Sequence, residues 1–238
     1  GPAFEGGEIS SGMRAAPGAI EEVKINDLFS APIIKIIGEK SPKGICGSGI
    51  IDLIAEMFKN KIIDRRGKLI KDNGNPRIKV DEHGIGSYIV ASKEEWPDIN
   101  EEVCITEVDL DNFIRAKGAV YSGAATLISS LGMSFSELDR VMIAGGIGNS
   151  LDIENSIIIG LLPDIPRDKF SYIGNSSLIG SYLTLMSEDA RKKMECIASQ
   201  MTYIELSVYP SYMDEFVSAC FLPHTNTDDF PSLSSLLG

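Results

Sequence analysis

The chain has 238 residues, of which 43% are hydrophobic and 24% charged, an ordinary mixture for one or two folded domains. No apolar run approaches the roughly 18 residues of a membrane-spanning helix. Acidic residues outnumber basic ones by 34 to 22, a net charge of -12, which disfavours binding to nucleic acid or to anionic lipid. We therefore expect a folded protein that binds neither nucleic acid nor a membrane.

Cysteine usage and the first residues bear on the cellular compartment. Cys46, Cys104, Cys196 and Cys220 are far apart in the sequence and form no Cys-x-x-Cys pair, so we expect no zinc knuckle or clustered iron–sulfur site in this chain. Their apolar neighbours favour buried thiols in a reducing cytoplasm. The chain starts without an initiator Met or a signal-peptide pattern. We expect a fragment of a cytoplasmic protein.

The first part of the chain predicts a strand, a helix and a surface excursion. The β-branched run from Pro32 to Gly38 is bounded by turn formers and indicates a strand. From Gly47 to Asn60 apolar residues recur every three or four positions, which predicts a helix. The charged stretch from Asp64 to Arg77 carries Asn-Gly and Asn-Pro turn signals and indicates a surface excursion, which we extend to about residues 64–102.

Strands and helices then alternate. Thr106 and Asp109 have capping-box spacing at the start of a helix from about Asp109 to Leu131. Gly118 lies inside this helix, where glycine lowers helix propensity by about 1 kcal/mol, so we expect a neighbouring backbone to pack closely there. The other expected elements are strands at 87–91, 103–106, 140–144, 170–173 and 203–208, and helices at 178–186, 188–200 and 213–221. Such alternation predicts an α/β architecture with a partly parallel sheet.

Two of the expected strands run directly into glycines. In open α/β sheets ligands bind beyond the carboxyl ends of strands, where glycine lets a ligand approach the backbone. Gly145, Gly146 and Gly148 follow the first strand, with Asn149 beside them, but the run lacks the spacing of a dinucleotide fingerprint. A tight turn that needs positive φ explains these glycines equally well. The second run, from Gly174 to Gly180, is also typical of a helix cap and close helix packing.

Lys117 is an anomaly within its helix. The apolar stripe of that helix spans a sector of about 140°, and Lys117 falls inside it. A buried ammonium is costly unless it is paired. Lys117 therefore extends to the surface, pairs within the protein, or faces a cleft that holds an anionic or hydroxylated ligand.

Other kinds of chemistry have little support in the sequence. His83 and His224 are the two histidines, and neither has a companion at metal-ligand spacing, so we expect both at the surface. No Gly-x-Ser-x-Gly nucleophile elbow and no Walker loop is present. The chain therefore displays no complete active site, no metal site and no assignable catalytic residue.

Several segments together resemble the C-terminal part of the reductive activators of corrinoid proteins. The resemblance is collinear and covers nearly the whole chain, so it is far more specific than any single glycine motif. The segments that carry it are Gly1–Ile9, Gly12–Ala15, Ile45–Asp52, Ile114–Lys117, Ile143–Asn149, Gly160–Asp164, Gly174–Gly180 and Tyr212–Phe216.

The resemblance implies a member of the superfamily of acetate and sugar kinases, heat-shock chaperones and actin. The fold class would be α/β, a ribonuclease-H-like half of an actin-like ATPase with a mixed sheet flanked by helices. Activators of this family use ATP and Mg²⁺ to drive an electron from an N-terminal iron–sulfur cluster to the Co(II) of a corrinoid protein. The Co(I) product serves corrinoid methyltransferase and O-demethylase systems. The implied partner is thus a corrinoid protein, and a homodimer is expected.

The resemblance also implies a nucleotide-binding site. Gly145 and Gly146 correspond to the adenosine motif, with Gly148 and Asn149 beside it. Lys117 lies where the nucleotide-facing helix of this superfamily often carries a lysine. The resemblance places Gly174 in the connection between the two halves, and Gly6 and Gly7 in a loop that faces the nucleotide from the other side.

The resemblance is incomplete in a way that affects activity. The two phosphate motifs of the family and its iron–sulfur domain precede the region that this chain covers, so this chain alone should hydrolyse ATP poorly or not at all. We expect residues 1–222 to form the C-terminal lobe and residues 223–238 a tail. Two alternatives stay open: a docking and dimerisation module with little nucleotide role, and a sugar or acyl kinase.

Overall fold

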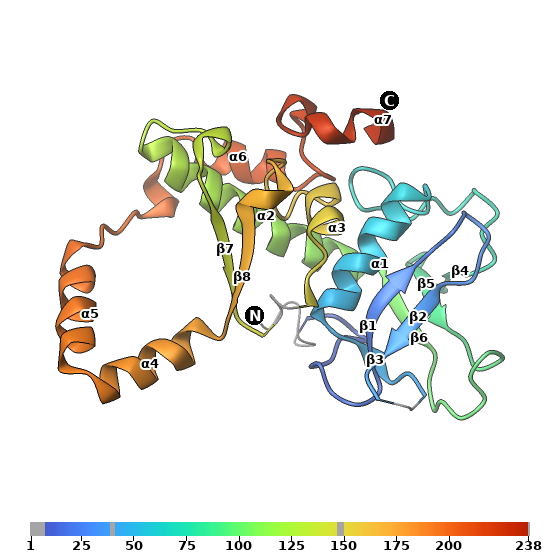
Figure 1. The fold of residues 1–238 in the computed structure, drawn as a ribbon. Coiled ribbons are helices and arrows are strands. Elements are labelled where there is room, and N and C mark those ends of the chain that lie inside the picture. The colour runs from blue at the N-terminus through green and yellow to red at the C-terminus, as the bar shows by residue number, and fades with distance from the viewer. Residues whose placement is uncertain (1–7, 39–40, 147–149, 238) are drawn as a thin grey trace.

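The computed structural model describes residues 8–38, 41–146 and 150–237 (Figure 1). Within these ranges the strands form three small sheets around two central helices. The strand orders are β2-β1-β3, β4-β5-β6 and β7-β8. The α/β class is confirmed, but the single mixed sheet that we expected is divided: the first sheet is mixed, the second antiparallel and the third parallel.

The first sheet packs against the most buried helix. β1 (Ala19–Lys24) pairs antiparallel with β2 (Ile33–Ile36) and parallel with β3 (Gly44–Ile45). α1 (Gly47–Lys59) packs on β1, and every residue from Gly47 to Phe58 is buried. A helix that is apolar nearly all round must be covered on every side, and α1 forms the centre of the core.

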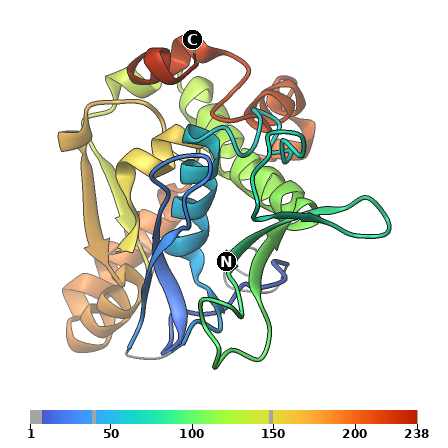
Figure 2. The same cartoon turned by 90° about the vertical axis from the view of Figure 1, so that its right-hand side faces the viewer.

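The second sheet is antiparallel and leads into the longest helix. It consists of β4 (Ile78–Val80), β5 (Gly86–Ala91) and β6 (Val103–Thr106), which face the viewer in Figure 2. β5 is buried at Tyr88, Val90 and Ala91, so the surface excursion that we expected over residues 64–102 contributes a core strand.

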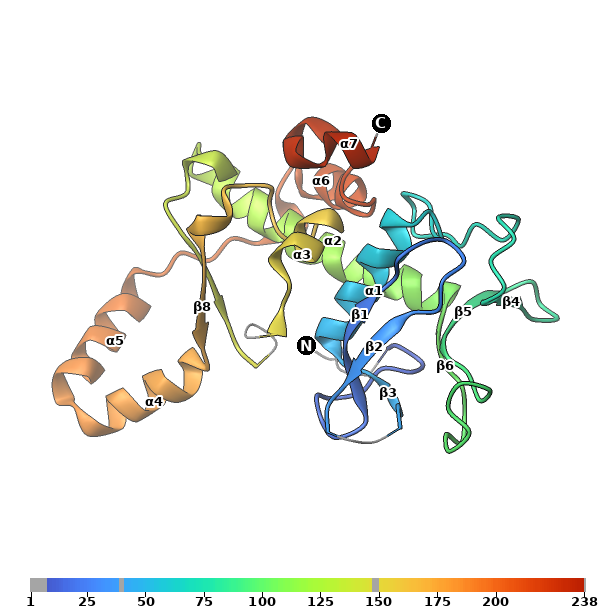
Figure 3. The ribbon, with the colours of Figure 1, turned by 45° about the vertical axis from the view of Figure 1, so that its right-hand side comes forward.

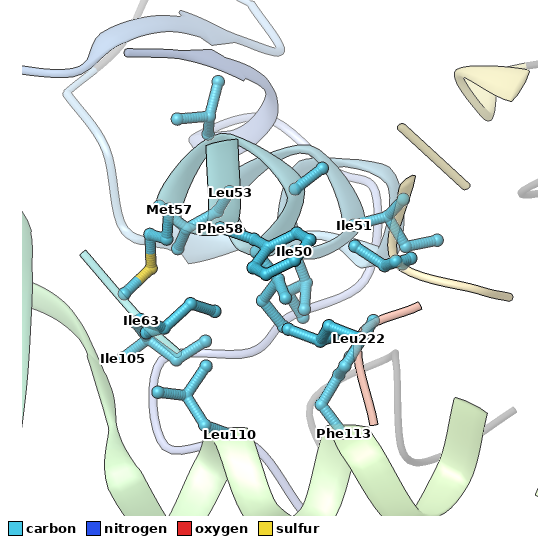
Figure 4. Close-up of a cluster of buried hydrophobic side chains, with 14 of the residues drawn as sticks. Ile50, Ile51, Leu53, Met57, Phe58, Ile63, Ile105, Leu110, Phe113 and Leu222 are labelled. Carbon is cyan, nitrogen blue, oxygen red and sulfur yellow. The ribbon is translucent and has the colours of Figure 1, made fainter. Parts of the chain in front are cut away.

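The predicted capping box is present at the start of α2 (Glu107–Ser130). Thr106 accepts from the Asp109 backbone N–H, and Asp109 in turn accepts from the Thr106 N–H. Figure 4 shows Ile50 and Phe58 of α1 above Leu110 and Phe113 of α2, with Leu222 beside them. α1 and α2 thus share one apolar core.

The third sheet has two parallel strands. After the short helix η1 (Phe135–Glu137), β7 (Val141–Ala144) pairs with β8 (Phe170–Gly174). Between them lie α3 (Ile153–Ile158), which packs on α1, and η3 (Arg167–Lys169). Beyond β8, α4 (Ser176–Met186) and α5 (Glu188–Gln200) form a hairpin that projects from the body in Figures 1 and 3.

The end of the chain returns to the core. The strand expected at residues 203–208 is wrong: the chain there forms η4 (Leu206–Val208), with no partner strand in the described part of the chain to satisfy its backbone groups. α6 (Tyr212–Ala219) packs along α2. A Cβ on Gly118 would lie 3.0 Å from Cys220 Sγ and 3.4 Å from the Ala219 carbonyl oxygen, so the close approach that we expected at this glycine is confirmed.

The residues that we expected to form a tail are packed. They contain η5 (Thr227–Asp229), η6 (Pro231–Leu233) and α7 (Ser234–Leu237). Phe230 and Leu233 are buried in the core. Arg65 Nη2 donates to the His224 carbonyl oxygen over 2.7 Å. The segment 223–238, as far as Leu237, therefore belongs to the same packed body.

Candidate nucleotide-facing site

The carboxyl ends of β7 and β8 bring the two glycine exits together. Gly145 has φ +102° and Gly174 has φ +66°, both in the left-handed region that glycine tolerates. The Gly145 N–H donates to the Gly174 carbonyl oxygen over 2.9 Å. The strands are parallel, so both turns lie at the same edge of the sheet, where α/β proteins bind ligands.

The backbone at this edge is bare. A Cβ built on Gly145, Gly146 or Gly174 would meet no atom within 4 Å in the described structure. Tight packing therefore does not explain these glycines. The left-handed backbone explains Gly145 and Gly174, but Gly146 needs neither positive φ nor room for a neighbour. Among the described residues nothing explains Gly146, which keeps it as a candidate position for contact with a ligand.

A pocket of about 250 Å³ opens beside Gly146. Pockets that enclose a whole ligand usually measure about 300–1,000 Å³, so this pocket fits one wall of a larger cleft. Its lining comes from the segment before β1, from β1, from the residue after β2, from the start of α1 and from residues that follow β7. The lining residues are Arg14, Ala15, Glu21, Ile37, Cys46, Gly47, Ser48, Gly146 and Ser150.

The first turn of α1 gives this pocket an electropositive wall. Cys46 precedes the helix and its side chain caps no backbone N–H, and the first turn contains no acidic residue. Ser48 Oγ donates to the Glu21 carbonyl oxygen over 2.9 Å. Helix N-termini favour anions through their N–H groups and the helix dipole. Arg14 adds a positive charge to the same lining, and Glu21 adds a carboxylate that lies 3.2 Å from Lys35 Nζ.

Sequence reasoning missed Arg14 and Ser48 as candidate site residues. It took Gly47-Ser48-Gly49 as the start of a helix, as a segment without nucleophile-elbow spacing and as part of the family resemblance, and it assigned no site role to Arg14 within that resemblance. Arg14 and Gly146 are far apart in the sequence, and they line one pocket only because the segment before β1, the start of α1 and the end of β7 meet there in the fold. Inspection of Ile45–Asp52 as a glycine-rich turn that opens a helix would have been the available signal.

Lys117 lies elsewhere and has partners of its own. Its side chain is completely buried, and its Nζ donates to the carbonyl oxygens of Phe221 and Pro223, each over 2.6 Å. Lys117 is not among the residues that line the pocket beside Gly146. Our expectation that its ammonium faces the same hollow as the glycines is therefore corrected in favour of pairing within the protein.

Burial has an electrostatic consequence for this lysine. It lowers the pKa of Lys117 to about 7, because removal from water penalises the charged form, and the nearby Cys220 opposes the shift only weakly. A neutral amine still carries two N–H donors, which matches the two carbonyl oxygens. Lys117 thus fastens the end of the chain to α2.

The other expected residues are placed as follows. Gly6, Gly7, Gly148 and Asn149 lie outside the described residues. His83 is exposed, as expected, whereas the surface position expected for His224 is wrong. His224 is buried against Tyr121 and Phe230, with Nε2 3.3 Å from Glu215 Oε1, because the segment that carries it returns to the core.

Metal binding finds no support in the described ranges. No group of three or more His, Cys, Asp or Glu side chains there could hold a metal ion. The four thiols are free and differ in burial, from the buried Cys46 to the exposed Cys196. Within the same ranges, no helix combines the length and apolar character that crossing a bilayer requires.

Comparison with known proteins identifies the family. A model described as the C-terminal domain of RACo, the ASKHA domain, matches residues 1–234. The chain belongs to this family of RACo C-terminal domains. The resemblance inferred from the sequence is therefore confirmed, and with it the assignment to the ASKHA class.

Named relatives agree with this family. The chain is 34% identical over 223 residues to the corrinoid activation enzyme RamQ of Eubacterium limosum, covering 91% of this chain and 37% of RamQ. It is 29% identical over 198 residues to a Methanosarcina barkeri [Co(II) methylated amine-specific corrinoid protein] reductase, covering 75% of this chain and 32% of that protein. The chain thus spans about a third of the length of these curated relatives.

A solved structure shares the fold closely. It is a reductive activator for corrinoid, iron-sulfur protein, 46% identical, with a TM-score of 0.90 over 98% of this chain and 37% of that one. The arrangement described above is therefore that of a RACo C-terminal domain.

Proposed function

We propose that this chain is the C-terminal nucleotide-binding lobe of an ATP-dependent reductive activator, a ribonuclease-H-like half of the ASKHA fold. The whole protein would return a corrinoid protein from Co(II) to Co(I) for methyl transfer. The observation that carries the nucleotide role is the bare backbone at Gly145 and Gly146, at the carboxyl edge of β7 and β8. The corrinoid chemistry of the proposal is taken from the named relatives, each of which is described as an activator or reductase of a corrinoid protein or as a corrinoid activation enzyme.

The site suits one side of a nucleotide. Gly145 and Gly146, with Gly148, Asn149 and Gly174, would form the adenosine side, since glycine leaves room for a flat base or a sugar. Arg14 and the start of α1 would face the anionic side, because both favour negative charge. Gly6 and Gly7 would approach from the segment before Arg14.

The remaining cofactors belong to other parts of the protein in this proposal. No group of three or more His, Cys, Asp or Glu side chains among the described residues could hold a metal ion, and we assign Mg²⁺ to the nucleotide phosphates and to the preceding phosphate motifs. The separate positions of the four cysteines leave the iron–sulfur cluster to the N-terminal domain. Binding of ATP would act by favouring one of two arrangements of the lobes, and it can shift that equilibrium only by its different affinity for the two.

The nucleotide role can be tested at Arg14. In the full-length protein, Arg14→Gln should weaken ATP binding about tenfold, equal to about 1.4 kcal/mol, because the pocket loses its cation. Arg140 is exposed and outside the pocket, so Arg140→Gln is the matched control and should bind ATP as the wild type does. Isothermal titration with ATP-Mg²⁺ measures both. Equal ATP affinities for the two variants would show that the pocket beside Gly146 is not part of the nucleotide site.

The same titration on this chain alone tests the need for the missing motifs. We expect weak binding and no hydrolysis, since the phosphate motifs of the family precede this region. Tight binding with turnover would contradict the assignment of these motifs to the preceding part.

The alternative of a docking and dimerisation module stays a prediction. The net charge of -12 would suit a basic partner surface, and a homodimer is expected in either case. Capture of a corrinoid protein by the full-length activator, with Co(I) formation by Arg14→Gln equal to that of the wild type at every ATP concentration, would favour this alternative. A sugar or acyl kinase would instead transfer phosphate to a small acceptor.

A further inference from the structure

A second pocket lies beside Tyr121 on α2. Its volume is about 370 Å³, within the usual range of small-molecule sites, and it shares no lining residue with the pocket beside Gly146. Its walls come from the end of α2 with η1, from the segment after α3, and from α6 with the end of the chain. α6 lies along α2 (Figure 3). We call this site the Tyr121 pocket, and its lining combines apolar side chains, such as Ile128 and Phe135, with carboxylates.

The Tyr121 pocket is negatively charged. Asp164, Glu215, Asp228 and Asp229 line it, and no lysine or arginine of the described ranges does. Arg167 Nη1 lies 2.6 Å from Asp164 Oδ1 and neutralises that carboxylate. The other three carboxylates form no ion pair with a lysine or arginine in the described part of the chain. A concave site lined by one sign of charge concentrates ions of the opposite sign, so this pocket favours a cation.

Glu215 keeps its negative charge although a histidine lies beside it. His224 Nδ1 accepts from the Asn226 backbone N–H over 3.1 Å, so the proton of the ring is on Nε2, which lies 3.3 Å from Glu215 Oε1. A histidine ring in this tautomer is neutral. His224 therefore does not supply the positive charge that the pocket lacks.

The hydroxyl group of Tyr121 has no partner in the protein. The residue is only 3% exposed, and within the described ranges its phenol oxygen forms no hydrogen bond. Its ring packs on Phe135 and Phe230, with centroids 5.5 and 5.8 Å away. A phenylalanine would make the same ring contacts, and a buried hydroxyl without a hydrogen bond costs stability. Packing therefore explains the ring of Tyr121 but not its hydroxyl.

The surroundings of that hydroxyl point to a cationic partner. Burial raises the pKa of the Tyr121 phenol, and the negative charges of Asp229, Glu215 and Asp164 raise it further. The hydroxyl is thus protonated and lies close enough to these carboxylates to interact with them. A hydroxyl oxygen accepts from an N–H group while its own proton is donated to a carboxylate. An ammonium group offers N–H donors and a positive charge together, which suits both the hydroxyl and the carboxylates.

We propose that the Tyr121 pocket binds a free alkylammonium ion. The ammonium would donate to the phenol oxygen of Tyr121 and pair with Glu215 and Asp229, and its alkyl chain would lie against Ile128 and Phe135. An inorganic cation would leave the apolar wall unused, and a neutral alkyl compound would leave the carboxylates unpaired. The pocket is concave and large enough to take up a whole small molecule, which favours a free amine over a lysine of another protein.

Isothermal titration of the full-length protein with n-butylammonium chloride tests the proposal. Sodium butyrate and 1-butanol, at the same ionic strength, are the matched ligands with the opposite charge and with no charge. We expect n-butylammonium to bind in the millimolar range, since so small a ligand has few atoms to contribute. The alcohol should bind at least about tenfold more weakly, because it lacks the charge that strengthens hydrogen bonds, and butyrate should not bind.

Two variants and one control locate the binding. Tyr121→Phe removes the hydroxyl and keeps the ring contacts, so it should weaken n-butylammonium binding about tenfold without lowering the thermal midpoint of the free protein. Asp229→Asn should weaken binding about fivefold. Asp72 is exposed and outside the pocket, so Asp72→Asn removes the same charge elsewhere and should leave the affinity unchanged.

Several results would overturn the proposal. Equal affinities of Tyr121→Phe and the wild type for n-butylammonium would show that the hydroxyl does not contact the ligand. Equal losses in Asp229→Asn and Asp72→Asn would show attraction to the net charge of the protein alone. No binding at concentrations up to tens of millimolar would leave the hydroxyl merely hydrated. Tighter binding of a short lysine peptide than of n-butylammonium would assign the pocket to a protein partner. None of these measurements depends on ATP or on reduction of cobalt, so they are independent of the proposed function.

Discussion

The buried amine of Lys117 makes folding stability depend on pH in a way that one substitution should abolish. Lys117→Met keeps the length of the apolar stem but removes both donors to the carbonyl oxygens of Phe221 and Pro223. Each buried carbonyl left without a donor costs about 1–3 kcal/mol, so the loss is about 2–6 kcal/mol. Methionine, however, avoids the free-energy cost of burying a charged ammonium. The size of that cost depends on pH, because it falls as the amine loses its proton.

The sign of the pH dependence follows from the two pKa values. The pKa of Lys117 is about 7 in the folded protein, against 10.5 for an unperturbed lysine, so the unfolded chain binds more protons between these values. Stability then rises with pH. From pH 7 to pH 9.5 the wild type should gain about 3 kcal/mol from this group, at up to about 1.4 kcal/mol per pH unit. Lys117→Met should lack this gain.

Urea denaturation at pH 7 and pH 9.5 measures the effect. At pH 7 the lost hydrogen bonds and the removed charge largely offset each other, so Lys117→Met should lie close to the wild type. At pH 9.5 it should be less stable by about 3 kcal/mol more than at pH 7. Arg115 is exposed on the same helix, and Arg115→Met should change stability by less than about 0.5 kcal/mol at either pH.

One outcome would refute this reasoning outright. If Lys117→Met followed the pH dependence of the wild type while losing affinity for ATP, the amine would face the nucleotide and not the end of the chain. Loss of the pH dependence with unchanged ATP affinity is the result that the geometry predicts.

Two further predictions concern single positions. Gly160 has φ +70°, and a Cβ there would lie 2.0 Å from the Pro223 carbonyl oxygen, whereas Gly132 has φ +69° and open space around it. In thermal unfolding, Gly160→Ala should therefore destabilise the protein by about 2–3 kcal/mol more than Gly132→Ala. Equal losses of stability would contradict the close contact at Gly160. Burial raises the pKa of Asp52 to about 6, above its unfolded value, so stability should fall as pH rises from 4 to 6. Asp52→Asn should therefore stabilise the protein by about 1–2 kcal/mol at pH 7 but not at pH 4 in urea denaturation, and equal effects at both pH values would refute it.

Local signals in the sequence located most of the helices. The Thr106–Asp109 capping box marked the start of α2 within a few residues, and α5 has the bounds predicted for it, because capping and apolar periodicity act over a single turn. The strands were harder to predict from the sequence. β1 was missed, and the strand expected at residues 203–208 is wrong, since a strand is stable only when another strand lies beside it.

The same distinction between local and long-range information applies to the residues of the candidate site. The sequence alone indicated that Gly145 and Gly146 follow a strand and that Lys117 lies on the apolar side of its helix, since both follow from the order of neighbouring residues. Only the tertiary structure decided that Lys117 bonds to carbonyl groups more than 100 residues away and that Arg14 lines the pocket beside Gly146. Contacts of this kind depend on how helices and sheets pack together, and periodicity within one element carries no information about the element that packs against it.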